Sequence, residues 1–261
     1  MVDTAVPSGL RSVVGRLVYA RAGRADASGR RLARMEAADP FSAQLRRAAD
    51  AIWRAQHEHP FVLGVADGTL AIEHFARYVR QDYLFLVEYA RLLALGAARA
   101  PDLETMRRFA ELAQAILGEE MELHRAFARE FGVSEADLER EQAAPVTRAY
   151  TDFLVRTAAL GSFAELAAAL LPCMWGYAEI GARLAERPDP SPEPRYARWI
   201  ETYAADDFQE LAAWCRGLVD RLAATAGDDE RERMRRAFLL SSEHELAFWD
   251  VGLTSTSGPP R

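Results

Sequence analysis

The chain contains no lysine and no asparagine, so arginine carries every positive side-chain charge other than that of histidine. Without lysine, the protein can form no lysine Schiff base and has no phosphate-loop lysine. Without asparagine, it has no acceptor for N-glycosylation. Only two cysteines are present, Cys173 and Cys215, and two do not make a disulfide framework in a chain of 261 residues. We therefore expect a reducing, cytoplasmic setting.

Long apolar runs are also missing. No window approaches the roughly 18 consecutive apolar residues that a membrane-spanning helix requires. The formal net charge is −7, and the main body of the sequence shows no basic groove. Neither nucleic acid nor an anionic membrane surface is therefore expected as a partner. Half of the residues are apolar, which is enough for one large domain with a single core or for two small ones.

The first 36 residues differ from the rest, because they carry many arginines and few acids, with Gly, Ser and Ala between them. An Arg-rich, acid-poor start is typical of a targeting peptide, but it also fits a flexible tail or an upstream start codon. We interpret residues 1–36 as a flexible extension. Residues 254–261, which read TSTSGPPR, are expected to form a loose C-terminal tail.

From Phe41 onward, apolar residues recur every three or four positions, which is the period of an α-helix, and no segment alternates as a strand does. Ser162 and Glu165 have the spacing of a capping box at a helix start. The sequence predicts an all-α protein in which residues 37–253 form a single compact helical bundle. Its helices include about 70–98, one that begins after Pro101 with Leu123 and Phe127 facing inward, about 195–226, and 229–251.

Two carboxylates fall on the apolar faces of these predicted helices. Asp82 belongs to the stripe Phe75, Val79, Asp82, Leu86, Tyr89 and Leu93. Glu245 belongs to the stripe Met234, Phe238, Ser241, Glu245 and Phe248 or Trp249. A buried, unpaired carboxylate is costly, so such a group finds a partner or its pKa rises. Taken singly, each is more often part of a structural ion pair than a catalytic group.

Cys173 differs from Cys215 because it directly follows Pro172. A proline inside a helix removes a backbone hydrogen bond and clashes with the carbonyl four residues back, at a cost of about 3 kcal/mol unless neighbours compensate. Two aromatic residues, Trp175 and Tyr177, come next, and Tyr177 shares a helix face with Cys173. This kink indicates the wall of a pocket. Cys215 lies in an ordinary amphipathic helix and is interpreted as packing.

Four segments in order carry a family resemblance: HPFVLGVADGTLAIEHFARYVRQDYLFL (59–86), EMELHRAFA (120–128), AALLPCMWGYAEIG (168–181) and SSEHELAFW (241–249). Together they resemble the TenA family, the thiaminase II or aminopyrimidine aminohydrolase proteins, from about Phe41 to Val251. The resemblance implies a heme-oxygenase-like all-α fold, usually assembled as a homotetramer. It also implies that hydrolysis needs no heme, no metal and no other cofactor.

The family's reaction cleaves the exocyclic C–N bond of a thiamine-derived 4-amino-2-methylpyrimidine. The substrate is an aminomethylpyrimidine or thiamine itself, and the product is hydroxymethylpyrimidine. By position, the resemblance makes Cys173 the nucleophile, Asp82 the carboxylate that holds a ring nitrogen and the 4-amino group, and Glu245 the proton shuttle. The substrate-binding residues that it implies are Phe85, Tyr150, Tyr177 and Tyr203.

Three features depart from the family pattern, and one of them is the sequence YAADDF (203–208), which replaces a more glycine-rich turn. Phe85 stands where a tyrosine is expected, three residues after Asp82, so one pocket hydroxyl is missing. His244 precedes Glu245 where an aromatic residue is common, and it would either tune Glu245 or face solvent. These changes leave the reaction class in place, and they leave open whether thiamine or a degraded aminopyrimidine is preferred.

Two other functions are alternatives. A dinuclear iron oxygenase of the same superfold would need several inward Glu, Asp and His side chains at helical spacing. His124 has Glu120 four residues before it, but the positions three and seven residues before it are apolar. A non-catalytic pyrimidine-binding or regulatory protein would need no such set of reactive residues, and no positively charged recognition helix is present. We therefore predict a cytoplasmic hydrolase that acts on a small-molecule aminopyrimidine.

Overall fold

The computed structural model describes residues 39–253, so the predicted extension 1–36 and tail 254–261 lie outside the described residues. Every regular element within this range is helical, as predicted. The elements in chain order are α2 (Phe41–Ala48), α3 (Asp50–His57), α4 (Pro60–Asp67), α5 (Ile72–Arg99), α6 (Leu103–Ala115), the π-helical turn η2 (Ile116–Glu120), α7 (Met121–Glu130), α8 (Glu135–Arg140), α9 (Pro145–Leu160), α10 (Phe163–Ala185), α11 (Pro194–Ala204), α12 (Asp206–Thr225) and α13 (Asp228–Leu253).

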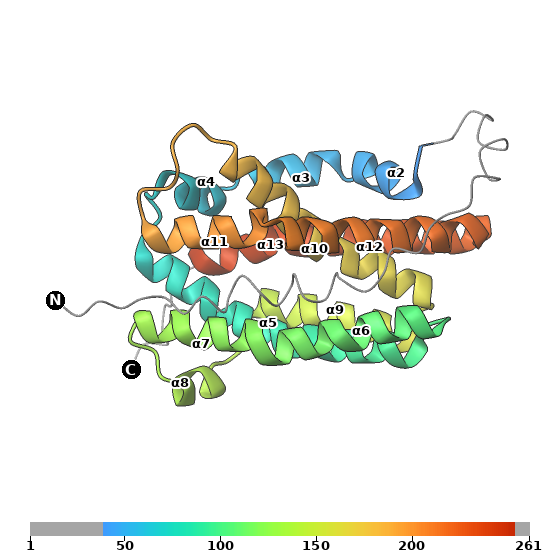
Figure 1. Cartoon of the computed structure of the whole chain (residues 1–261), viewed down its shortest axis with the longest axis horizontal. Coiled ribbons are helices and arrows are strands. Elements are labelled where there is room, and N and C mark those ends of the chain that lie inside the picture. Colours follow the sequence, from blue (N-terminus) through green and yellow to red (C-terminus); the bar gives the residue numbers. More distant parts are fainter. Residues whose placement is uncertain (1–38, 254–261) are drawn as a thin grey trace.

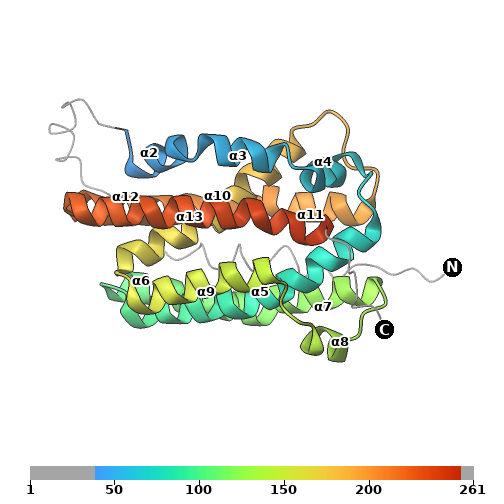
Figure 2. The ribbon, with the colours of Figure 1, turned by 180° about the vertical axis from the view of Figure 1, so that it is seen from behind.

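The helices form two layers that run side by side (Figure 1). One layer contains α5, α6, α7 and α9, and the other contains α10, α11, α12 and α13, with α2, α3 and α4 along its outer side. Figure 2 shows the same two layers from behind. Helix α10 is the central element, because it packs against α9 and α5 of the first layer and against α11, α12 and α13 of its own.

The faces that the sequence assigned to the interior are buried. All six residues of the α5 stripe, including Asp82, are less than a tenth exposed, and so are all residues of the α13 stripe, including Glu245. Between them lies a core rich in aromatic rings, among which Trp53, Trp249, Tyr78 and Phe61 are almost completely buried. The 3.6-residue period therefore predicted correctly which face of each of these two helices packs inward.

Helix α10 begins at the predicted capping box. The Ser162 hydroxyl oxygen accepts from the Glu165 amide at 3.0 Å, and the Glu165 carboxylate accepts from the Ser162 amide at 2.8 Å. Pro172 lies inside the helix without ending it. The helix continues because residues 166–172 are all buried, and this packing offsets the cost of the proline.

The prediction of one helix over 195–226 is wrong. Ala205 adopts extended backbone (φ −60°, ψ 142°) between α11 and α12. Asp206 and Asp207 favour a new helix start there, because acidic side chains stabilise the N-terminal end of the helix dipole. The break also lies close against α10: a Cβ added to Gly181 would come within 2.6 Å of the carbonyl carbon of Tyr203. The break and this close approach together place Tyr203 between the layers.

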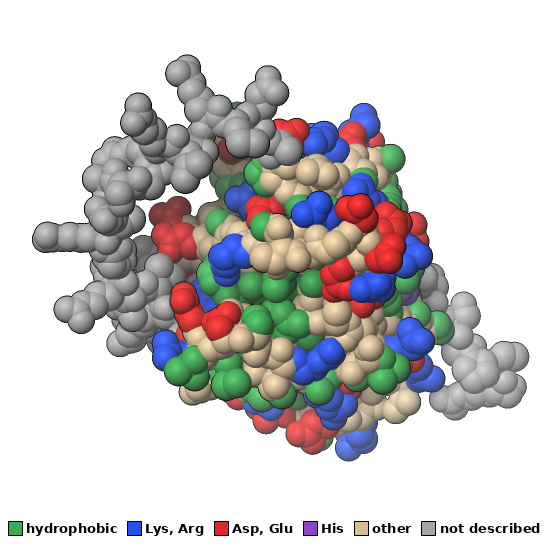
Figure 3. All heavy atoms as spheres, turned by 90° about the vertical axis from the view of Figure 1, so that its right-hand side faces the viewer, with side chains coloured by type: hydrophobic (Ala, Val, Ile, Leu, Met, Phe, Trp, Pro, Cys, Tyr) green, Lys and Arg blue, Asp and Glu red, His purple; other side chains and the backbone are tan. Residues whose placement is uncertain are grey.

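The face at the right of Figure 1 carries acidic and basic side chains interspersed around apolar ones (Figure 3). Neither sign of charge dominates this face. In the part of the chain that the structure describes, no helix combines the length and the apolar character needed to cross a membrane.

Candidate functional site

A cavity of about 180 Å³ lies between the two helical layers. Its walls come from α5, α6, η2, α7 and α9 on one side and from α10, α11, α12 and α13 on the other. All seven residues that the sequence singled out line this one cavity: Asp82, Phe85, Tyr150, Cys173, Tyr177, Tyr203 and Glu245. Residues up to 163 positions apart in the chain therefore meet at a single site. Most of the remaining wall is apolar, from side chains such as Leu93, Leu112, Phe208 and Leu211.

Glu245 is buried at the cavity wall, with 2% of its surface exposed. The hydroxyl of Tyr150 donates a hydrogen bond of 2.5 Å to Glu245 Oε1. Burial raises the pKa of Glu245 to about 7, although the hydrogen bonds from Tyr150 and Cys173 act in the opposite direction; the negative charge of Asp82 adds to the increase. Near neutral pH this carboxyl can therefore both accept and donate a proton.

Tyr150 is held in place by side chains of α13. Its hydroxyl lies 3.1 Å from Ser241 Oγ of α13, and that serine donates to the carbonyl of Ala169 on α10 at 2.7 Å. His244 stacks on the Tyr150 ring at 5.2 Å between centroids, with 13° between the planes. His244 is partly buried, which lowers its pKa, so it braces Tyr150 as a neutral ring.

Asp82 forms a buried ion pair with His124, which the sequence did not place at the site. Asp82 Oδ2 lies 2.8 Å from His124 Nε2, and His124 Nδ1 lies 2.9 Å from the backbone carbonyl of Glu120. Burial alone would lower the pKa of His124, but the hydrogen bond and charge of Asp82, together with Glu120, raise it to about 9. At neutral pH both ring nitrogens donate, and the imidazolium holds Asp82 as an oriented carboxylate.

His124 reaches the interior because the helix is interrupted by η2. A π-turn contains one residue more than an α-turn, so it rotates everything after it by about one residue position. After η2, His124 is 5% exposed and lies inward together with Leu123, which the regular period placed inward and which is partly buried and lines the cavity. The only sign of His124 in the sequence was the polar residue types of the segment EMELHRAFA. A π-turn cannot be predicted from the helical periodicity of apolar residues.

Cys173 lies on α10 directly after Pro172 and is partly buried. Burial raises the pKa of its thiol well above the ordinary 9.0, and the charges of Glu245 and Asp82 raise it further. A hydrogen bond links the thiol to the carboxyl of Glu245. The resting cysteine is therefore a neutral thiol beside a carboxyl group that can take its proton. Cys215 is 1% exposed, away from the cavity lining, as expected for a packing residue.

Tyr177 and Tyr203 form an aromatic wall opposite α5. Their ring centroids are 4.9 Å apart, and Tyr177 also packs 5.2 Å from Trp249. The hydroxyl of Tyr177 is 3.1 Å from that of Tyr78, which holds the ring in place. Burial raises the pKa of both tyrosines far above the ordinary value, so both stay neutral. Such a wall suits a flat, neutral or cationic ring.

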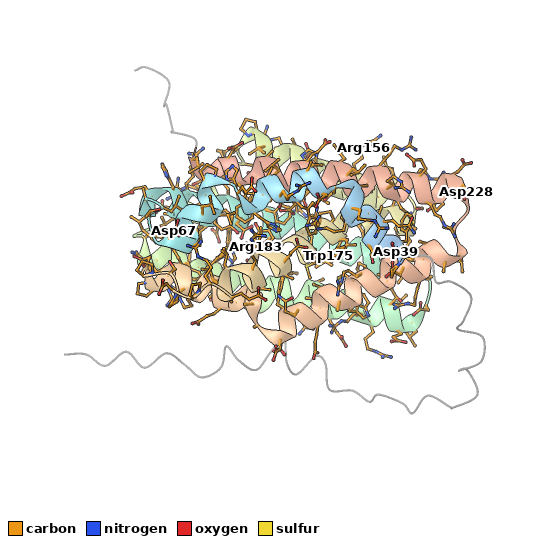
Figure 4. The ribbon with its side chains drawn as sticks, turned by 90° about the horizontal axis from the view of Figure 1, so that it is seen from above. Asp39, Asp67, Arg156, Trp175, Arg183 and Asp228 are labelled. Carbon is orange, nitrogen blue, oxygen red and sulfur yellow. The ribbon has the colours of Figure 1, made fainter. Side chains whose placement is uncertain are left out.

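A second hollow, of about 400 Å³, lies on the opposite side of α10, where Figure 4 labels Trp175 and Arg183 near α3 and α12. Several of its ionic groups contact other parts of the protein: Glu179 pairs with Arg46 at 2.7 Å and with His57 at 3.4 Å, and Arg216 lies over the Trp175 ring. Among the residues that the structure describes, no group of three or more His, Cys, Asp or Glu side chains is arranged to hold a metal ion.

Comparisons with known proteins place the chain among related sequences and structures. The chain is similar to an aminopyrimidine aminohydrolase of Halalkalibacterium halodurans, with 43% identity over 211 residues that cover 81% of this chain and 94% of the relative. A TenA homologue from P. horikoshii OT3 superposes with a TM-score of 0.76 at 33% identity, over 81% of this chain and 97% of that one.

A domain from Shewanella denitrificans with a heme oxygenase-like fold superposes with a TM-score of 0.63 at 13% identity, over 81% of this chain and 91% of its own. This likeness confirms the predicted fold. The model of the TENA/THI-4/PQQC family matches residues 46–255. The chain therefore belongs to the TENA/THI-4/PQQC family.

Proposed function

We propose that this protein is an aminopyrimidine aminohydrolase of thiamine metabolism. It cleaves the C–N bond at the exocyclic methylene carbon of a thiamine-derived 4-amino-2-methylpyrimidine and puts a hydroxyl group in place of the leaving amine, while the 4-amino group stays on the ring. One observation carries the proposal: a single cavity brings together a thiol, a carboxyl group with a pKa near 7 and an ion-paired carboxylate. The chemistry needs these three groups. The name of the Halalkalibacterium relative supports the same reaction.

Asp82 is the group that makes the ring electrophilic. Its carboxylate, held by His124 at 2.8 Å, accepts hydrogen bonds from a protonated ring nitrogen and from the 4-amino group of the substrate. The resulting amidinium-like cation is stabilised by a fixed negative charge in a site from which water is largely excluded. Tyr177 and Phe85 contact the faces of the flat ring, and Tyr203 closes the wall beside them.

Cys173 then adds to a ring carbon. Its thiol proton passes to the hydrogen-bonded carboxylate of Glu245, an S–C bond forms, and an electron pair of the cationic ring moves to the ring nitrogen. The ring loses its aromaticity and becomes neutral. Its electrons can now expel the exocyclic amine, which leaves with the proton that Glu245 had received.

Water completes the exchange. It adds to the exocyclic carbon and returns a proton to Glu245, after which the sulfur leaves the ring and recovers a proton from the same carboxyl. Aromaticity is restored, and the net change is water consumed and ammonia or an amine released. Glu245 transfers a proton in both directions, which requires a pKa close to the working pH.

The two alternatives are less well supported. A dinuclear iron centre would need at least three converging acidic or histidine ligands, and the described residues hold no such group. In this site His124 is a partner of Asp82, with its second ring nitrogen on a backbone carbonyl. A purely regulatory protein would not need a thiol beside a titrating carboxyl group.

The test is to incubate metal-free protein with aminomethylpyrimidine and, separately, with thiamine, and to follow hydroxymethylpyrimidine by mass spectrometry. Turnover of either compound supports the proposal, and the ratio of the two rates identifies the preferred substrate. Cys173→Ser is expected to abolish turnover without loss of the helical circular dichroism signal. Cys215→Ala is the matched control and is expected to keep its turnover. Turnover by Cys173→Ser at the wild-type rate would contradict the mechanism.

The proposal includes a homotetramer in the cytoplasm, as the family resemblance implies. Light scattering on the purified protein is expected to give four times the mass of one chain. A monomer at enzyme-assay concentrations would remove this part of the proposal and leave the reaction untouched, since all the reacting groups come from a single chain.

A further inference from the structure

Tyr89 carries a buried hydroxyl on the cavity wall that has no hydrogen-bond partner of ordinary geometry. The residue is 2% exposed and lies on the same α5 stripe as Asp82. Among the described residues, few buried side-chain polar atoms are unpartnered in this way, and this is the one that belongs to a cavity-lining residue. An unpaired buried hydroxyl costs about 1–3 kcal/mol. Such a cost is typical of a group whose partner arises during function.

This hydroxyl lies one helical turn from Phe85, the position at which the family resemblance leads us to expect a tyrosine. Phe85 precedes Tyr89 by four residues, so the two lie one helical turn apart, and their rings stack at 5.4 Å with 22° between the planes. The Phe85 ring also packs 5.1 Å from Tyr150 and offers no hydrogen-bond donor to the thiol. The α5 face therefore keeps one hydroxyl near Cys173, displaced by one turn.

Two other tyrosine hydroxyls at the cavity wall, those of Tyr150 and Tyr177, are already engaged. Tyr150 donates to Glu245, and Tyr177 is hydrogen-bonded to Tyr78. Tyr89, by contrast, faces Cys173, and its hydroxyl lowers the pKa of that thiol, whereas Glu245 and Asp82 raise it. Tyr89 is thus the neutral donor available to a sulfur atom that is otherwise surrounded by groups opposing its ionisation.

We propose that Tyr89 is a positioning residue, whose hydroxyl donates a hydrogen bond to the sulfur of Cys173 as it loses its proton and so takes over from the hydroxyl that Phe85 lacks. The role in turnover rests on the proposed function, whereas the effect on the thiol does not. The donated hydrogen bond stabilises the thiolate and aims it at the ring. It also gives the buried hydroxyl the partner that it lacks in the resting state.

The groups that face the thiol come from four helices and set the charge background of any pH measurement. They are Tyr89 and Asp82 on α5, Tyr150 on α9, Tyr203 on α11 and Glu245 on α13. Among these, a change from tyrosine to phenylalanine at position 89 removes one oxygen atom and no charge. A change in the pH at which the Cys173 thiol ionises would therefore be due to the loss of the hydrogen bond and not to a change in charge.

The experiment compares Tyr89→Phe and the hydroxyl swap Tyr89→Phe/Phe85→Tyr, both in a Cys215→Ala background so that Cys173 is the only thiol. The rate of alkylation by iodoacetamide is measured against pH, together with kcat and KM. In Tyr89→Phe the alkylation profile is expected to move up by about one pH unit. The value of kcat is expected to fall by about tenfold to a hundredfold, as for the loss of a hydrogen bond to a charged group, with little change in KM. The double variant is expected to recover part of the change in the alkylation profile and part of the loss in kcat.

An alkylation profile that Tyr89→Phe leaves in place would overturn the proposal, whatever happens to kcat. If the alkylation profile shifts in Tyr89→Phe and the double variant Tyr89→Phe/Phe85→Tyr does not reverse the shift, the hydrogen bond is still supported. Such a result would mean that only a hydroxyl at position 89 has the geometry to donate it. Should the wild type show the expected alkylation profile and no turnover, the hydrolase assignment fails while the effect on the thiol stands. Thermal unfolding is expected to be unchanged or slightly higher in Tyr89→Phe, because the lost oxygen has no ordinary partner in the resting protein.

Discussion

Replacing His124 with glutamine removes a buried positive charge while keeping an amide donor close to Asp82. The folded-state pKa of His124 is about 9, against an ordinary 6.5, because Asp82 and Glu120 outweigh the effect of burial. Between these two pH values the folded protein holds a proton that the unfolded chain does not. The stabilisation is therefore complete below pH 6.5 and is lost as the pH rises through about 9. At about 1.4 kcal/mol per pH unit, the loss is about 3 kcal/mol.

Urea denaturation of the wild type and of His124→Gln across this pH range measures the effect. The difference in free energy of unfolding between the two proteins is expected to shrink by about 3 kcal/mol from the acidic to the alkaline end. Other groups titrate as well: burial lowers the pKa of His57 and His244 and raises that of both thiols. Both proteins share these groups, so their contributions cancel in the difference.

If the difference in free energy of unfolding between the two proteins stays constant from about pH 6 to about pH 10, the ion pair between His124 and Asp82 does not stabilise the fold. This result would mean that His124 is neutral when buried and that Asp82 is held by its hydrogen bond alone. The chemical shift of the His124 ring carbon protons, followed by NMR over the same range, gives an independent reading of the same titration.

Two further changes test the residues that support the site. Tyr150→Phe removes the hydrogen bond that lowers the pKa of Glu245. The rise of kcat/KM with pH, whose midpoint is expected around 7 in the wild type, should therefore move to higher pH. A midpoint that does not move would mean that ionisation of Glu245 does not control kcat/KM. Gly181→Ala forces a Cβ to within 2.6 Å of the Tyr203 backbone, which should cost about 1–3 kcal/mol and raise KM. Gly217→Ala, whose Cβ would meet nothing closer than 3.5 Å, is its control, and equal melting temperatures for the two would contradict the packing argument.

The fold and most of the cavity wall could be predicted from the sequence because long amphipathic helices carry a strong periodic signal. Asp82 and Glu245 are polar residues on otherwise apolar stripes, and a stripe specifies which side chains share the interior. The pocket tyrosines are a different case. Residues such as Tyr150 and Tyr203 were named through the family resemblance, since spacing alone does not distinguish them from ordinary core residues.

What the sequence could not provide depends on local departures from regular helix and on partner geometry. The π-turn before α7 brings His124 into the interior beside Leu123, and the break at Ala205 divides a segment whose pattern is continuous. Tyr89 was correctly assigned to the buried stripe, but the lack of a partner for its hydroxyl is a property of the packed structure. A pattern of residue types contains neither kind of information.

Because α5, α10 and α13 each supply one reacting group, the site is complete only when α13, the last helix of the described chain, has packed against the other two. Helix α13 packs against both α10 and α5, so an intermediate built from the preceding helices would leave an apolar surface of α10 uncovered and would lack Glu245. Such an intermediate would be prone to aggregation and chemically silent. During refolding, the recovery of turnover should therefore coincide with the packing of α13 and should come after the formation of helical structure. Turnover can thus be used to measure the completion of folding.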